Sequence, residues 1–324
     1  MAIETWMRET EATVNSQDSY KEDALKDDEI EMIYNYFEEA LSFELSKRNL
    51  LILLKSVKLL LIVTSNLKTV RSKLAPLFDS LLVNILSSGL NDKLKKLFVQ
   101  EFTILLENCI DDSEANFHVV TGLSQRLIGL GSNSNIMVWI RATLLKSLNK
   151  LLVGPPSEIR INIFHKHQKE IDSLVDGLYL CGDYDFQVTI IETLLKVTNK
   201  SIRQQVVKEW FPNYVKVQSL FLRIKDFETD CRNFLNLLNE GLGENCHVFS
   251  YKAISCQSEG TVMSKPDELN EMWIDINLGS KNVSWYYVLQ GAKVRPLIFF
   301  SLPLLTLLLL GSSLEAIHCQ QEGC

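Results

Sequence analysis

The chain is 324 residues long and 46% hydrophobic, which excludes a wholly disordered protein and supplies enough apolar surface for one large domain or two smaller ones. Its formal net charge of −7 argues against a protein whose whole surface binds nucleic acid. Seven cysteines without a CxxC pair, and an amino-terminal region without the apolar core of a signal peptide, favour a reducing compartment.

Residues 1–28 are acidic and polar, and we expect a disordered or loosely helical arm there. The arm ends in an acidic run from Lys21 to Asp28. Such a run is either a docking tail for a basic partner or a segment that water simply solvates, and the sequence leaves both open.

Residues 29–243 carry the apolar spacing of amphipathic helices, interrupted by capping and breaking residues. Alternate helices are predicted to begin at Lys47, Asn91, Asn135 and Asp183, about 45 residues apart. This spacing is typical of armadillo and HEAT units, although no residue-level repeat is visible. The sequence therefore predicts a mostly α protein built as an armadillo/HEAT-like helical solenoid.

The first helical third concentrates positive charge in an otherwise acidic chain. Such a patch could meet phosphates or an acidic partner, or it could be a scattered solvated face. No aromatic residues interleave with the cations as a track for single-stranded nucleic acid requires. The residues of this predicted basic patch are Lys47, Arg48, Lys55, Lys58, Lys68, Arg71 and Lys73.

Three helices with clear stops are predicted between Gly182 and Gly241. Asp183 or Asp185 is expected to cap the first and Ser201 the second, since short polar side chains accept from free N–H groups of the opening turn. Pro212 should end the second helix directly after Trp210 and Phe211, which we expect to be buried. Gly241 and Gly243 can end the third.

After Gly243 the composition becomes strand-like. Strands are predicted in residues 246–255, 273–278 and 283–288, with a turn at residues 279–282 between the last two. Two or three strands cannot form a stable sheet alone. We therefore expect them to lean on the helices or to belong to an incomplete domain.

Three stretches carry a resemblance to a known family: GDYDFQVTIIETLLKVTNKSIRQQVVKEWF, RIKDFETDCRNFLNLLNEGLGENCHVFSY and WIDINLGS. Together they resemble the amino-terminal region of the synaptonemal complex protein 2 family, which includes a 2-like relative. The residues that carry the resemblance are Gly182, Asp183, Asp185, Gln187, Trp210, Phe211, Phe227, Thr229, Asp230, Cys231, Arg232, Trp273, Asp275, Asn277 and Gly279.

The resemblance implies an armadillo-like domain at residues 29–243 and, at 244–290, a short, incomplete β-rich segment of the Spt16M/PH-like kind, similar to the middle domain of the histone chaperone Spt16. It also implies a non-enzymatic scaffold in the nucleus, on meiotic chromosome axes or at centromeres. Family members assemble with synaptonemal complex protein 3 through a carboxy-terminal coiled coil. No heptad segment of that sort is present here, so direct binding to that partner is not expected.

Residues 291–324 differ in composition and fall outside the resemblance. Pro296 to Leu314 carries no charge over 19 residues, which is close to what a membrane-spanning helix requires. Pro303 interrupts this run. The stretch is interpreted either as an unrelated hydrophobic tail on a truncated product or as a membrane anchor.

No pattern in the sequence predicts catalysis or a cofactor. His165 and His167 are two residues apart on a predicted helix and should point in different directions, which disfavours a shared metal. No phosphate-binding or nucleophile motif occurs. An alternative function is a generic armadillo-type adaptor held on a membrane by the tail. An importin-like peptide groove is disfavoured, because Trp139 and Trp210 are not followed four residues later by asparagine.

Overall fold

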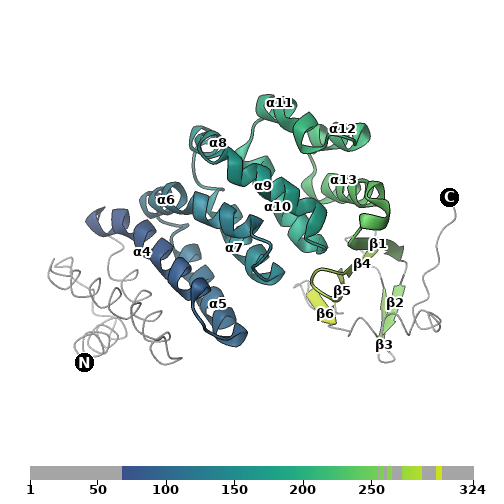
Figure 1. Ribbon diagram of the computed structural model, residues 1–324, viewed down its shortest axis with the longest axis horizontal. Helices are drawn as coiled ribbons and strands as arrows, with labels where there is room; N and C mark the ends of the chain where they lie inside the picture. Colours follow the sequence, from purple (N-terminus) through teal and green to yellow (C-terminus); the bar gives the residue numbers. More distant parts are fainter. Residues whose placement is uncertain (1–67, 254, 259–260, 265–271, 287–296, 301–324) are drawn as a thin grey trace. The chain divides into compact units, whose positions relative to one another are not determined.

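The computed structural model describes residues 68–253, 255–258, 261–264, 272–286 and 297–300. This part of the chain is mostly helical, with a short antiparallel sheet at its carboxy-terminal end (Figure 1). The helices are α4 (Lys68–Ser87), α5 (Asp92–Asn108), α6 (Ser113–Ser132), α7 (Val138–Leu151), α8 (Ser157–Lys166), α9 (Gln168–Leu180), α10 (Tyr184–Val197), α11 (Lys200–Trp210), α12 (Val215–Arg223) and α13 (Phe227–Gly241).

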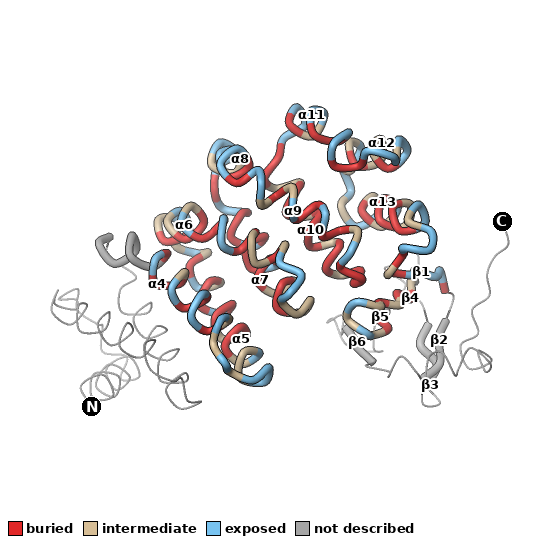
Figure 2. Tube along the Cα trace, viewed as in Figure 1, coloured by how far each residue is buried: buried red, intermediate tan, exposed pale blue. Residues whose placement is uncertain are grey.

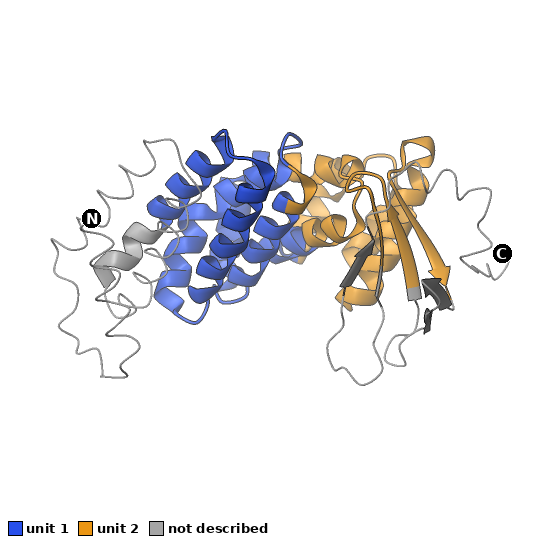
Figure 3. Ribbon diagram, turned by 90° about the horizontal axis from the view of Figure 1, so that it is seen from below, with its two compact units in different colours: residues 1–136, 140–171, 192–199 blue, residues 137–139, 172–191, 200–324 orange. Residues whose placement is uncertain are grey.

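The chain divides into two compact units, drawn in different colours in Figure 3. The first comprises residues 1–136, 140–171 and 192–199, and the second comprises residues 137–139, 172–191 and 200–324. In both units buried residues run along the helices on the sides that face neighbouring helices (Figure 2).

The predicted spacing of about 45 residues is confirmed by the helix starts. Helices α5, α7 and α10 begin at Asp92, Val138 and Tyr184, which are 46 residues apart in each case. The Asn91 side chain caps α5 by accepting a hydrogen bond from the Leu94 N–H. Local capping therefore sets one of these starts, as the sequence indicated.

Side-chain contacts in the first unit repeat with the same period. Arg126 in α6 pairs with Asp79 in α4 at 2.6 Å, and the partners lie 47 residues apart in sequence. Gln125 donates to Glu170, which lies 45 residues further along the chain. In a stack of helical pairs, each helix contacts the equivalent helix of the next pair at a constant offset in sequence. These contacts therefore describe such a stack within the first unit.

Asn149 is a buried polar residue that joins two helices of this stack. Its side chain is 1% exposed, donates to Glu192 Oε2 and accepts from the Thr193 hydroxyl. Its backbone oxygen accepts from Lys196 Nζ at 2.6 Å. These bonds satisfy the buried amide and join α7 to the end of α10.

In the second unit, aromatic side chains form the core of helices α11 to α13. The Phe211, Phe221 and Phe234 rings are fully buried, with centroids 5.3 to 5.7 Å apart. Trp210 contacts Phe221 at 5.9 Å and donates from its indole Nε1 to Asp172. The predicted burial of Trp210 and Phe211 is confirmed, and α11 ends at Trp210 before Pro212 as expected.

The capping predictions for α10 and α11 have different outcomes. Asp183 caps α10, since its Oδ1 accepts from the Phe186 N–H at 2.9 Å. The predicted cap at Ser201 is wrong, because α11 begins one residue earlier at Lys200 and Ser201 lies inside the helix. Of the two glycines expected to end α13, Gly243 takes a left-handed conformation with φ +54°, whereas Gly241 is the last helical residue and has no positive φ.

The sheet has the strand order β1-β4-β5-β6, and every pairing is antiparallel. Its strands are β1 (Val248–Ala253), β4 (Met272–Asn277), β5 (Asn282–Tyr286) and β6 (Leu297–Phe300), while β2 (Ser255–Ser258) and β3 (Thr261–Ser264) form a separate hairpin. The predicted strands and the turn between β4 and β5 are confirmed.

Strand β6 corrects one expectation. The sequence placed residues 297–300 in a separate hydrophobic tail, yet these four residues pair with β5, with Val283 opposite Phe300. A short apolar stretch serves equally well as a buried strand, and periodicity alone cannot distinguish that from the start of a tail.

Several expectations lie outside the described residues. These are the arm at residues 1–28, most of the basic patch, and the rest of the tail from residue 301. Lys68, Arg71 and Lys73 fall in α4, but the structure describes side chains only from Ala75 onward. Among the described helices, none is long and apolar enough to cross a membrane.

Candidate functional site: the junction between helices and sheet

The side of the sheet that contacts the helices is polar. Because side chains alternate along a strand, Ser250 in β1, Asp275 and Asn277 in β4, and Ser284 in β5 share one face. Asp275, Asn277 and Ser284 are 0%, 2% and 1% exposed. Burying so many polar groups costs free energy unless each finds a partner, so the contacts of this face are informative.

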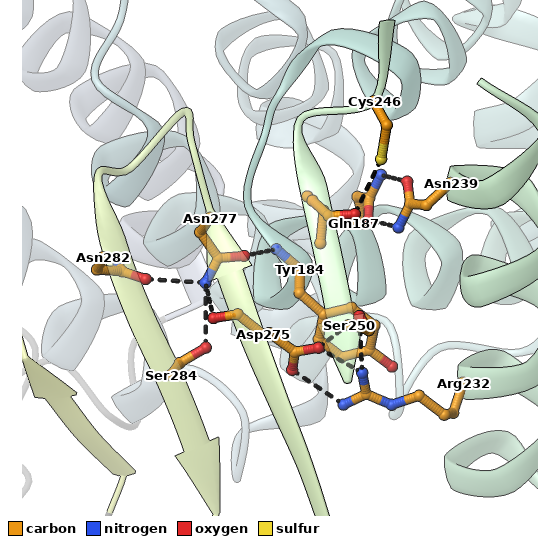
Figure 4. Close-up of polar contacts among 11 residues, drawn as sticks. Tyr184, Gln187, Arg232, Asn239, Cys246, Ser250, Asp275, Asn277, Asn282 and Ser284 are labelled. Carbon is orange, nitrogen blue, oxygen red and sulfur yellow. Dashed lines mark hydrogen bonds and ion pairs between the residues drawn. The ribbon is translucent and has the colours of Figure 1, made fainter. Parts of the chain in front are cut away.

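An ion pair between Arg232 of α13 and Asp275 lies at the centre of this face (Figure 4). The guanidinium donates two parallel hydrogen bonds, 2.7 Å from Nη1 to Oδ1 and 3.1 Å from Nη2 to Oδ2. The Ser250 hydroxyl donates a third to Asp275 Oδ1 at 2.6 Å. Burial raises the pKa of the Asp275 carboxyl, and the Arg232 charge opposes this rise.

Aromatic rings pack around the guanidinium. Arg232 Cζ lies 3.5 Å from the centroid of the Tyr184 ring and 5.3 Å from that of Trp273. A cation over an aromatic face is attracted by the ring quadrupole, most strongly where water is excluded. The first residue of α10, one residue of β4 and the middle of α13 are thereby joined.

Asn277 links α10 to the β4–β5 hairpin (Figure 4). Its Oδ1 accepts from the backbone N–H of Tyr184 at 2.8 Å, which satisfies one of the free N–H groups at the start of α10. Its Nδ2 donates to Asn282 Oδ1 at 2.8 Å and to Ser284 Oγ at 3.1 Å. One side chain thus anchors both the helix start and the hairpin.

Gln187 and Asn239 form a reciprocal amide pair in which each donates to the other, at 2.8 and 3.0 Å. Gln187 Nε2 also donates to the backbone oxygen of Leu178 at 2.9 Å. Both side chains are buried, so the pair holds α9, α10 and α13 in one register.

Two glycines allow the backbones of the helical region and the hairpin to meet. The Gly279 N–H donates to the Gly182 oxygen at 2.8 Å, and Gly182 has φ +57°. A Cβ on Gly279 would lie 2.1 Å from the Cys181 oxygen, and one on Gly182 would lie 2.6 Å from the Gly279 nitrogen. Only glycine fits this contact at either position.

Gly279→Ala is therefore expected to lower the free energy of unfolding by about 1 to 3 kcal/mol, because the added methyl group forces the hairpin away from Cys181. Thermal denaturation followed by circular dichroism measures the loss. Gly89→Ala is the matched control, since a Cβ at Gly89 meets nothing within 4 Å, and it should change stability by less than about 0.5 kcal/mol. Equal melting temperatures for the two variants would contradict this account.

The structure brings most of the predicted residues together at this junction. Gly182, Asp183, Gln187, Arg232, Trp273, Asp275, Asn277 and Gly279 all contribute to it, and Cys231 is buried beside them in α13. Asp183 acts locally, as the cap of α10.

Other predicted residues lie elsewhere. Trp210 and Phe211 belong to the aromatic core, while Phe227, Thr229 and Asp230 form the start of α13. Asp230 Oδ2 accepts from the backbone N–H groups of Lys225 and Asp226, so its role there is local. Asp185 lies in the first turn of α10.

Sequence reasoning missed five residues of the junction: Tyr184, Asn239, Ser250, Asn282 and Ser284. Tyr184 lay within the GDYD stretch that was singled out for its aspartates. Ser250 and Ser284 carried a usable signal, because each is a polar residue in a run of aromatic and β-branched residues.

The polar groups of the junction serve to hold its helices and strands together. Its charged and amide groups bond to one another, and among the described residues no group of three His, Cys, Asp or Glu side chains could hold a metal. His165 is exposed and His167 is buried, so they do not share an environment.

Comparison with known proteins gives a consistent answer. Human synaptonemal complex protein 2 is 34% identical over 178 residues, which are 53% of this chain. The mouse synaptonemal complex protein 2-like protein is 32% identical over 179 residues, also 53% of this chain. Over this matched half, the chain is similar in sequence to members of the synaptonemal complex protein 2 family. No family model matches the sequence.

The match to the synaptonemal complex protein 2 family covers a small part of each relative. The chain spans 12% of the human protein and 21% of the mouse 2-like protein. A solved structure of a synaptonemal complex protein superimposes with a TM-score of 0.61 and 22% identity, covering 88% of this chain and 80% of that one. At that identity the likeness establishes the fold alone.

Proposed function

We propose that this chain is a non-enzymatic interaction module of the meiotic chromosome axis, acting in the synaptonemal complex lateral element or at centromeres. The observation that carries the proposal is the identity to synaptonemal complex protein 2, a family whose name places its members in the synaptonemal complex. Many of the residues by which the sequence resembles that family also build the junction between helices and sheet, while others lie in the aromatic core and at the start of α13.

A binding role agrees better with the junction than a catalytic one. Catalytic groups need a free acid, base or nucleophile beside a site for substrate. At the junction Asp275 is occupied by Arg232 and Ser250, and the Gln187 and Asn239 amides occupy each other. These residues stabilise a scaffold, and the exposed faces of the helices remain for protein partners.

Protein partners on the axis or at the centromere would bind the helical region. A stack of helical pairs presents long, regular surfaces whose inner residues are fixed by packing, which suits the binding of other proteins. The acidic net charge of −7 makes protein partners a better match than DNA for the chain as a whole.

The proposal is tested by expressing the tagged full chain in meiotic cells together with a marker of chromosome axes. We expect the tag to follow axes or to form foci at centromeres. The control variant Gly89→Ala should localise in the same way. A variant that disrupts the junction, such as Gly279→Ala, should localise less well. A folded chain that stays in the cytosol while full-length family members occupy the axes would contradict the proposal, and a membrane signal would favour the adaptor alternative.

A further inference from the structure

Helix α12 presents an unusual exposed face to solvent. Val215 is 75% exposed and Leu222 is partly exposed, and the two lie seven residues apart. Lys216 and Arg223 are both exposed and are also seven residues apart. Because seven residues are close to two helical turns, the two apolar residues lie on one side of α12 and the two basic residues lie on a neighbouring side, with the polar Gln218 and Ser219 in the turn between. We call Val215, Lys216, Leu222 and Arg223 the α12 face.

The α12 face lies in a locally basic part of an acidic protein. Between Lys200 and Lys225 there are six basic residues and a single acidic one, Glu209. Arg126, Lys150, Lys196 and Arg232 are among the described cations that form ion pairs, whereas Lys216 and Arg223 form none with the described residues. The positive charge of the α12 face is therefore not neutralised by a direct partner within the described residues.

Two of the three acidic residues at the start of α13 are engaged locally, and the third, Glu228, is exposed. Asp226 Oδ2 accepts from the Thr229 hydroxyl, and Asp230 Oδ2 accepts from the N–H groups of Lys225 and Asp226. The inner side of α12 is not available to a ligand, since Val217 and Phe221 are buried in the aromatic core. A ligand would thus meet the α12 face on a rigid helix.

We propose that the α12 face is a docking surface for an acidic amphipathic helix of a protein partner. Two apolar residues one heptad apart, beside two cations with the same spacing, form a surface that a helix with apolar a and d positions and acidic flanking positions complements. This inference rests on the proposed function and names the partner's chemistry.

Nucleic acid fits the α12 face less well. Phosphates would pair with Lys216 and Arg223, but Val215 and Leu222 would lose water without gaining an apolar partner. Two cations on one face also provide few phosphate contacts. Charge complementarity and the two apolar residues together favour a protein helix.

The test uses the purified full chain and a three-heptad synthetic peptide with leucine at a and d and glutamate at e and g, whose own charges discourage self-association. Fluorescence anisotropy of the labelled peptide reports binding. We expect the double variant Lys216→Glu, Arg223→Glu to bind the peptide about tenfold more weakly or worse, because its new glutamates repel the glutamates of the peptide. A peptide with serine in place of leucine should bind the parent chain more weakly as well.

The matched control is Lys146→Glu with Lys166→Glu, which changes two exposed lysines of the first unit and alters the net charge equally. It should bind the peptide like the parent chain. Equal binding by the α12 double variant and the parent, or equal weakening by the control, would overturn the proposal. So would a DNA duplex that binds the parent more tightly than the peptide and loses this binding in the α12 double variant.

Because this assay uses isolated components, its result is separate from that of axis localisation. If the parent chain localises to meiotic axes but peptide binding does not depend on Lys216 and Arg223, the docking role of the α12 face is overturned. The proposed function then still stands. Peptide binding that depends on these residues supports the face whatever the chain's location in cells.

Discussion

Arg232→Ala is expected to lower the free energy of unfolding by about 3 to 5 kcal/mol, because it leaves the Asp275 carboxylate buried without a cation. Asp275 is 0% exposed, so water cannot replace the two hydrogen bonds that the guanidinium donates. The lost stacking on the Tyr184 ring adds to the effect. Urea denaturation followed by tryptophan fluorescence measures the loss.

Three further variants separate the causes. Lys225→Ala removes an exposed cation seven residues away and should cost less than about 0.5 kcal/mol. Arg232→Lys keeps the positive charge but not the bidentate hydrogen bonding to Asp275. Its loss of unfolding free energy should therefore lie between those of Lys225→Ala and Arg232→Ala. Replacing both Arg232 and Asp275 by apolar residues should recover much of the loss, since no buried charge remains. An Arg232→Ala midpoint equal to that of Lys225→Ala would contradict a buried ion pair.

Trp210→Ala is expected to cost a similar amount, about 3 to 5 kcal/mol, by opening a cavity in the aromatic core of the second unit. Trp210 is 4% exposed, packs on Phe221 and donates to Asp172 at 2.9 Å. Thermal melting of the variant and its parent provides the comparison.

Trp210→Phe is the informative control for this cavity. It preserves most of the apolar area but removes the hydrogen bond to Asp172, which is worth about 1 kcal/mol. Its cost should therefore lie clearly below that of Trp210→Ala. If both variants had the same melting temperature as the parent, the indole would be exposed in solution, and its role would be that of a binding anchor.

Local signals in the sequence predicted the helical part of the fold well. Asn91 and Asp183 cap helices through bonds to backbone groups three residues away, and Pro212 follows the end of α11. Such signals act over a few residues, so they can be read without the fold. Ser201 failed as a cap because a serine one position inside a helix has the same local sequence context as one at its boundary.

The junction was predictable only in part. Its residues were named from their resemblance to a family, but nothing in the sequence indicated that Arg232 meets Asp275, 43 positions away, or that Gln187 meets Asn239, 52 positions away. Long-range partners depend on how elements pack, and a polar residue on a strand does not disclose which helix will face it.

The sequence by itself determined most helix starts to within a few residues, a period of about 45 residues and the presence of strands after Gly243, because each follows from interactions between residues close along the chain. The tertiary structure alone decided which face of the sheet contacts the helices and why that face is polar. It also decided why Gly279 cannot carry a side chain, since the Cys181 oxygen that excludes a Cβ comes from a segment almost a hundred residues earlier. Residues 297–300 became a strand for the same reason, because β5 offered them an edge that no local pattern could reveal.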